Sequence, residues 1–130
     1  MKLCVYLSGW TQETEYRKTV KENYSDKLRL IDPMTITPIG VCEKVGENCD
    51  YVYIIQRDKK LILKSDILVA YINRLSFGTI MEVMYSYDHG IPVYVINPSG
   101  EFLDDPWLLF HSIKQFRRIE DCFDFITSKK

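Results

Sequence analysis

The feature of this sequence that most constrains its fold is an uncharged apolar run at residues 67–72, Ile-Leu-Val-Ala-Tyr-Ile. Six residues are too few to span a membrane, and they suit a strand that is covered on both faces. Segments of helical composition lie on either side of the run, at residues 50–64 and 78–89. A buried strand between two helices is typical of a parallel α/β sheet, in which helices cover both faces.

The same alternation extends along the chain. It predicts strands at residues 3–7, 28–31, 67–72, 93–96 and near 116, and helices at about 12–24, 50–64, 78–89, 107–113 and 119–127. Thr79 is expected to be the N-cap of the helix at 78–89, and Gly90 the glycine that ends it. We therefore expect a single α/β domain over residues 1–130. Its fold is a doubly wound, five-stranded parallel sheet, Rossmann-like and with flavodoxin-like strand order.

Composition and charge exclude several classes of protein. The formal net charge of −1 provides no field that would attract a nucleic acid polymer or an anionic membrane. The apolar start lacks the features of a signal peptide, and no run approaches a membrane span, so we expect a cytoplasmic protein. The four cysteines form no metal-ligand spacing and are expected to be reduced, two of them in the core; a metal site on Cys42 and Cys49 would lack a second ligand pair.

Ligands of parallel α/β sheets bind at the carboxyl ends of the strands, which here are followed by residues 8–11, 73–79 and 97–105. The second of these loops leads into Ser76-Phe-Gly-Thr-Ile-Met-Glu82. Thr79 and Glu82 have the spacing of a capping box, in which both side chains would serve the helix start. Alternatively, the Glu82 carboxylate points into the ligand crevice and acts as a nucleophile.

Two other residues allow two interpretations each. Asp58 lies at helical spacing from Ile55 and Ile62, so its carboxylate either points inward with them or lies at a solvated edge of their stripe. Trp10, which follows the first strand, either stacks on a nucleobase or covers the edge of the core. Asp66, which opens the central strand, is expected to be a structural residue that caps or turns the chain.

Taken together, these segments resemble the nucleoside 2-deoxyribosyltransferase family, which includes the nucleoside 5′-monophosphate N-hydrolases. The match runs from Val-Tyr-Leu-Ser-Gly-Trp at residues 5–10, through Asp58 placed eight residues before Asp66, to the segment 76–82 and on to about residue 96. The resemblance implies that Glu82 is the nucleophile and Asp58 a substrate-directed carboxylate. It also implies that the substrate is bound by Ser8, Gly9, Trp10, Ser76, Gly78 and Thr79.

One position distinguishes the two branches of that family. The transferases carry an aspartate six residues before the nucleophile, whereas this chain has Ser76, as the monophosphate hydrolases do. The resemblance therefore implies cleavage of the N-glycosidic bond of a nucleoside 5′-monophosphate through a glycosyl-enzyme ester on Glu82, with water as acceptor and no metal or cofactor. The alternatives are base exchange between deoxynucleosides and, in another class, a non-catalytic nucleotide sensor. A sensor has no need of the paired Asp58 and Glu82.

Related enzymes complete each active site with residues of a neighbouring subunit, so the resemblance also implies a homo-oligomer, a dimer or larger. The segment 105–112 is apolar and contains Trp107 and Phe110, which either form part of such an interface or simply cover the sheet. His111 and Ser112 are the candidates for a shared site.

Overall fold

The computed structural model describes residues 2–35 and 50–128. Its sheet contains the strands β1 (Cys4–Gly9), β2 (Arg29–Ile31), β3 (Ile67–Tyr71), β4 (Val93–Ile96) and β5 (Lys114–Phe116). The strands are hydrogen-bonded in the order β2-β1-β3-β4-β5, and every pair of neighbours is parallel. This is the flavodoxin-like order, so the predicted fold class is confirmed.

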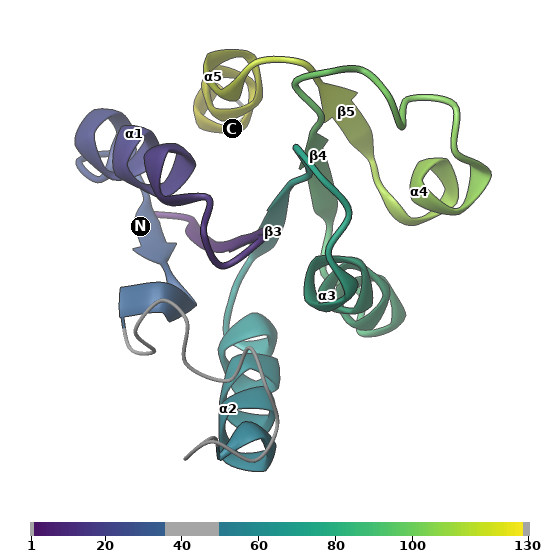
Figure 1. Cartoon of the computed structure of the whole chain (residues 1–130). Helices are drawn as coiled ribbons and strands as arrows, with labels where there is room; N and C mark the ends of the chain where they lie inside the picture. Colours follow the sequence, from purple (N-terminus) through teal and green to yellow (C-terminus); the bar gives the residue numbers. More distant parts are fainter. Residues whose placement is uncertain (1, 36–49, 129–130) are drawn as a thin grey trace.

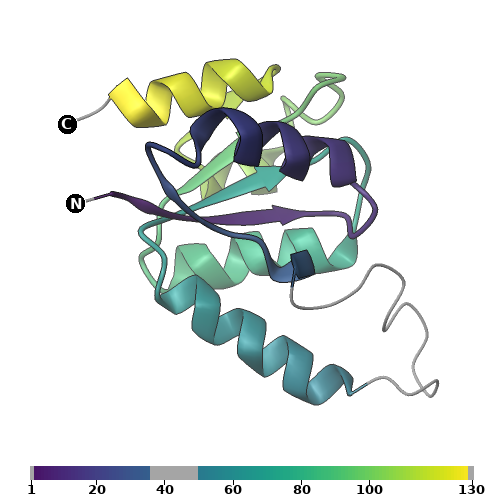
Figure 2. The same cartoon turned by 90° about the vertical axis from the view of Figure 1, so that its left-hand side faces the viewer.

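Helices cover both faces of this sheet (Figures 1 and 2). On one face lie α1 (Thr14–Tyr24) and α5 (Ile119–Ser128), and on the other α2 (Tyr51–Leu63) and α3 (Phe77–Asp88). The short α4 (Pro106–His111) packs beside α3, and a 3-10 turn, η1 (Pro33–Thr35), follows β2. The helices begin and end close to the predicted bounds, because their apolar residues recur with the helical period.

The core has two layers, because alternate strand residues point to opposite faces of the sheet. Val5, Leu7 and Val69 belong to the layer under α1 and α5, whereas Tyr6 and Leu68 belong to the layer under α2, α3 and α4. The residues from Leu68 to Ala70 have no exposed surface. The run that suggested a central strand is therefore covered on both faces.

The start of α3 differs from the prediction. Ser76 has extended backbone geometry (φ −142°) and is the N-cap, so Thr79 lies inside the first turn and its assignment as N-cap was wrong. The Thr79 side chain is buried rather than turned toward the free N–H groups of the helix start. Gly90 follows the helix with φ +76°, as predicted. Asp66 accepts a hydrogen bond from the Cys4 backbone N–H at 2.8 Å, which confirms a structural role.

Two of the four cysteines, Cys4 and Cys122, are free and buried, as expected. Cys42 and Cys49 lie outside the described residues. In the parts of the chain that the structure describes, no three His, Cys, Asp or Glu side chains are grouped to hold a metal ion. None of the helices within residues 2–35 and 50–128 is long and apolar enough to cross a bilayer.

Candidate active site

Glu82 lies in α3, and its carboxylate is turned toward β1. The Tyr6 hydroxyl donates to Oε2 at 2.8 Å and the Ser8 hydroxyl donates to Oε1 at 2.6 Å. The two donors are two residues apart on one strand, so their side chains point to the same face of the sheet. Because both carboxylate oxygens are engaged by β1, the capping-box interpretation of Glu82 is wrong. Ser8, predicted to bind substrate, is here a partner of the candidate nucleophile.

The environment of Glu82 brings its pKa close to neutrality. Burial is the largest cause, and it raises the pKa of Glu82 to about 7, with a smaller contribution from the Asp58 carboxylate. The hydrogen bonds from Ser8 and Tyr6 lower this pKa and offset part of the rise. The pKa of the Tyr6 phenol lies far above its ordinary value, first through burial and then through the nearby Glu82 charge. Tyr6 therefore stays protonated and donates, and Glu82 gains or loses its proton near neutral pH.

A cavity of about 260 Å³ lies between α2 and α3, and Glu82 forms part of its wall. Its lining consists of two helical stripes, each with the spacing i, i+3, i+4, i+7. The α2 stripe is Ile55, Asp58, Lys59 and Ile62, and the α3 stripe is Gly78, Met81, Glu82 and Tyr85. Residues at this spacing share one face of a helix, so the fold brings Asp58, Gly78 and Glu82 to one cavity.

Asp58 is not at a solvated edge, since its side chain is only 16% exposed. Arg57 donates to Asp58 Oδ1 through Nε at 3.1 Å and through Nη2 at 2.8 Å. Burial raises the pKa of Asp58, and the Arg57 hydrogen bond and charge partly offset that rise. Sequence analysis did not single out Arg57, which stands among other charged residues and reads as part of a surface helix.

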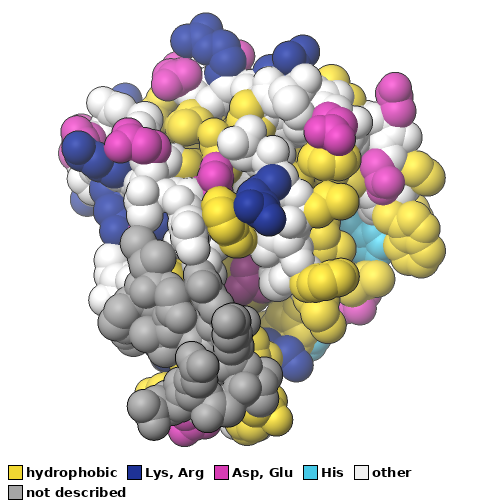
Figure 3. All heavy atoms as spheres, in the orientation of Figure 1, with side chains coloured by type: hydrophobic (Ala, Val, Ile, Leu, Met, Phe, Trp, Pro, Cys, Tyr) yellow, Lys and Arg dark blue, Asp and Glu magenta, His cyan; other side chains and the backbone are white. Residues whose placement is uncertain are grey.

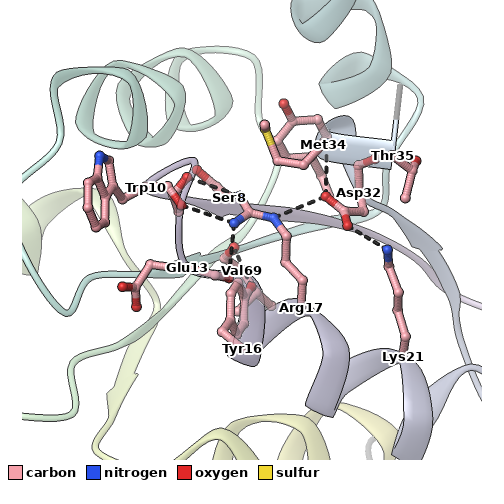
Figure 4. A network of polar contacts seen from close by, with 12 residues as sticks. Ser8, Trp10, Glu13, Tyr16, Arg17, Lys21, Asp32, Met34, Thr35 and Val69 are labelled. Atoms are coloured by element: carbon pink, nitrogen blue, oxygen red, sulfur yellow. Dashed lines mark hydrogen bonds and ion pairs between the residues drawn. The ribbon is translucent and has the colours of Figure 1, made fainter. Parts of the chain in front are cut away.

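The loop after β1 is fixed by a buried charge from α1 (Figure 4). Arg17 donates to the carbonyl oxygens of Gly9 and Trp10, at 3.0 Å each, and forms a 3.0 Å ion pair with buried Asp32. Lys21 also contacts Asp32, at 2.6 Å. At Gly9, a Cβ would lie 3.3 Å from the Tyr71 carbonyl oxygen, so the close approach of β1 and β3 favours glycine there. No sequence motif indicated Arg17 or Asp32.

Trp10, which was predicted either to stack on a base or to cover the edge of the core, makes a close contact with Arg74. The Arg74 guanidinium carbon lies 3.9 Å from the centroid of the Trp10 ring, a close cation–π contact. Trp10 follows β1 and Arg74 follows β3, so the contact joins the carboxyl ends of two neighbouring strands. One face of the ring is therefore occupied by Arg74, and a base could stack only on the other.

The remaining predicted residues lie at the start of α3. Ser76 makes no capping hydrogen bond with its side chain, and a Cβ at Gly78 would meet nothing within 4 Å. The buried Thr79 hydroxyl has no hydrogen-bond partner among the described residues. Ser76 and Gly78 are thus placed at an open helix start, whereas Thr79 is turned into the protein.

His111 and Ser112 do not line the Glu82 cavity. His111 Nδ1 lies 2.7 Å from the Trp107 carbonyl oxygen, and the Ser112 hydroxyl donates to the Leu108 carbonyl oxygen at 2.6 Å. Both side chains satisfy the end of α4, so within one chain neither belongs to this site.

These features define a class: a flavodoxin-like α/β protein with two carboxylates in one cavity at the side of its sheet. Neither a family model nor a curated protein matches the sequence. The fold is similar to that of a 2-deoxyribosyltransferase from the bacterium Bacillus psychrosaccharolyticus (TM-score 0.73, 18% identity, 98% of this chain and 92% of that one). It is also similar to that of a conserved protein from Enterococcus faecalis V583 (TM-score 0.71, 15% identity, 95% and 96%). The chain has the nucleoside 2-deoxyribosyltransferase-like fold.

Proposed function

We propose that this protein is an N-glycosidase that hydrolyses nucleoside 5′-monophosphates through a glycosyl-enzyme intermediate on Glu82. The observation that carries the proposal is the Glu82 carboxylate itself. It is held by Tyr6 and Ser8, it lines a cavity together with Asp58, and burial raises its pKa to about 7. A carboxylate fixed by two donors beside a second carboxylate is the arrangement that glycosyl transfer requires.

In the proposed reaction, the ionised Glu82 attacks C1′ of the sugar through an oxocarbenium-like transition state. A C–O bond forms to the carboxylate, the C1′–N bond breaks, and its electron pair goes to the base. Asp58, whose pKa is raised by burial, is the proposed donor of a proton or a hydrogen bond to the base. Water then attacks C1′, its proton passes to the base anion or to the Asp58 carboxylate, and the C1′–O bond to Glu82 breaks to release the carboxylate.

Base exchange is the second candidate, favoured by the likeness to the 2-deoxyribosyltransferase structure. The two reactions share the intermediate and differ in whether water or a second base attacks it. Incubation with nucleosides and 5′-monophosphates, with and without an acceptor base, separates them by chromatography. Release of free base without an acceptor supports hydrolysis, whereas a new nucleoside formed only with an acceptor supports transfer.

Three features support a 5′-phosphate subsite at the start of α3. The Ser76 side chain is not used as a cap, Gly78 leaves open space, and the first N–H groups of a helix favour an anion. Arg74, two residues before Ser76, adds a cation at the same end of the sheet. The Arg74 guanidinium carbon lies 3.9 Å from the Trp10 ring centroid, and a guanidinium that contacts an aromatic face can still donate N–H groups to a phosphate.

The Ser76→Asp variant tests this subsite. The wild-type protein is expected to prefer a deoxynucleoside 5′-monophosphate to the free nucleoside by about 1.5–3 kcal/mol in kcat/KM, the scale of a charge-assisted hydrogen bond. An aspartate should abolish or reverse this preference by repelling the phosphate charge. Ser76→Ala, the matched control, removes the donor without adding a charge and should lose less. Equal activity of the wild type on both substrates contradicts the phosphate assignment.

Assembly into a dimer or larger oligomer remains a prediction, and an apolar surface supports it. Hydrophobic side chains gather over α3 and α4 (Figure 3), where Phe77, Trp107 and Phe110 are 92%, 69% and 66% exposed. Apolar surface of this kind marks a contact site in many soluble proteins. Light scattering of an active preparation should give a multiple of 15.3 kDa. A monomeric mass at full activity contradicts the prediction.

A further inference from the structure

Lys59 places a cation in the wall of the Glu82 cavity. It belongs to the α2 stripe that also carries Asp58, and its Nζ lies 5.2 Å from the centroid of the Tyr85 ring, on the facing stripe of α3. Lys59 is an exposed residue, and this cation–π contact brings its ammonium group to the wall of the cavity. Among the described residues that line the cavity, Lys59 is the single cation.

The two carboxylates of the cavity, Asp58 and Glu82, leave the charge of Lys59 free to act on the base. The Asp58 carboxylate is paired with Arg57, which donates two hydrogen bonds to one of its oxygens. The Glu82 carboxylate loses its charge when it becomes an ester with C1′. At that moment the electron pair of the C1′–N bond passes to the base, so negative charge moves from Glu82 to the leaving group. Lys59 is the cavity cation that can meet this charge.

We infer that Lys59 stabilises the departing base, so that the cavity favours bases that leave as oxo anions over amino bases that must be protonated to leave. The inference rests on the proposed glycosidase reaction and deepens it by naming the class of base. A ring carbonyl on the base accepts a hydrogen bond from the ammonium, whereas an exocyclic amino group at the same position presents a donor to a donor. A base that leaves as its anion, without a proton from Asp58, afterwards takes the proton released by the water that attacks C1′.

Two purine substrates that differ in the group at C6, and with it in the hydrogen on N1, test this role. The 2′-deoxynucleoside 5′-monophosphates of hypoxanthine and adenine carry an oxygen and an amino group, respectively, at C6. The wild type is expected to have the higher kcat/KM for the hypoxanthine substrate. Lys59→Met should lower that value about 10- to 100-fold, the range of a charge-assisted hydrogen bond, and change the adenine value by less than about threefold.

Lys60→Met is the matched control, because Lys60 is the next residue of α2 and is exposed like Lys59 but does not line the cavity. It should leave both kcat/KM values unchanged. Equal losses for both substrates in Lys59→Met, or no loss for either, overturn the inference.

Failure of the proposed reaction has a different signature, namely that the wild type releases neither base. In that case, calorimetry with free hypoxanthine and free adenine tests Lys59 without turnover. Hypoxanthine should bind the wild type at least about fivefold more tightly than Lys59→Met, with adenine affected less. Equal affinities of the wild type and the variant for hypoxanthine overturn the inference.

Discussion

The Glu82→Gln variant is expected to release base at least about 10⁴-fold more slowly than the wild type, since an amide cannot replace the carboxylate that attacks C1′. The substitution keeps the side-chain length and leaves Tyr6 and Ser8 with hydrogen-bonding partners. Single-turnover measurements of base release show the effect. Glu22→Gln, an exposed glutamate of α1, is the matched control and should keep full activity.

The free energy of unfolding of Glu82→Gln shows whether the variant loses activity because it lacks the carboxylate or because its fold is disturbed. Because the pKa of Glu82 rises from 4.5 to about 7 on folding, the folded wild type binds the extra proton between these values. Its stability therefore falls as the pH rises through this window, by about 3 kcal/mol once the pH exceeds 7. The variant carries no such group and should be the more stable protein at pH 8, with the difference vanishing near pH 4.5. Urea unfolding at both pH values measures this, and lower stability of the variant at pH 8 contradicts it.

The pH dependence of catalysis should follow the same carboxyl group. Only ionised Glu82 attacks C1′, so kcat/KM is expected to fall about tenfold per pH unit below a pH of about 7. Ser8→Ala and Tyr6→Phe each remove a hydrogen bond that lowers the pKa of Glu82. Both variants should therefore move the acid limb to higher pH.

The profile is best measured with the unphosphorylated nucleoside as well, because a substrate phosphate itself titrates near pH 6. A fall in kcat/KM at low pH that is seen with both substrates is caused by a group of the protein and not by the substrate phosphate. A flat kcat/KM between pH 5 and pH 8, or a limb that Ser8→Ala and Tyr6→Phe leave in place, contradicts the assignment to Glu82.

The sheet could be predicted from the sequence because the apolar residues of the helices recur with the helical period and the strands are short apolar runs between them. The short, uncharged run at 67–72 indicated a buried strand, and the positions of Asp58 and Glu82 followed from helical spacing together with the family resemblance. Spacing also shows why both belong to one cavity: each lies at an inner position of an i, i+3, i+4, i+7 stripe, and the two stripes face one another.

The partners of these carboxylates could not be predicted from the sequence. Tyr6 and Ser8 reach Glu82 across more than seventy residues of chain, and no local pattern records such a pairing. Arg17, with its ion pair to Asp32, holds the loop after β1 through backbone carbonyls, which leave no trace in side-chain identity. In the sequence, Lys59 is one of four consecutive charged residues, and only the structure shows its contact with Tyr85 on the facing helix α3.

The most direct test of the central claim is mass spectrometry of the protein quenched during turnover of a 5′-monophosphate. Proteolysis of the quenched sample isolates the peptide that contains Glu82. That peptide should gain the mass of one sugar phosphate less one water, with fragmentation placing the adduct on the Glu82 carboxylate, and Glu82→Gln should show no adduct. An adduct on another residue, or active turnover with an unmodified peptide and a sugar product of inverted configuration at C1′, contradicts a covalent intermediate on Glu82.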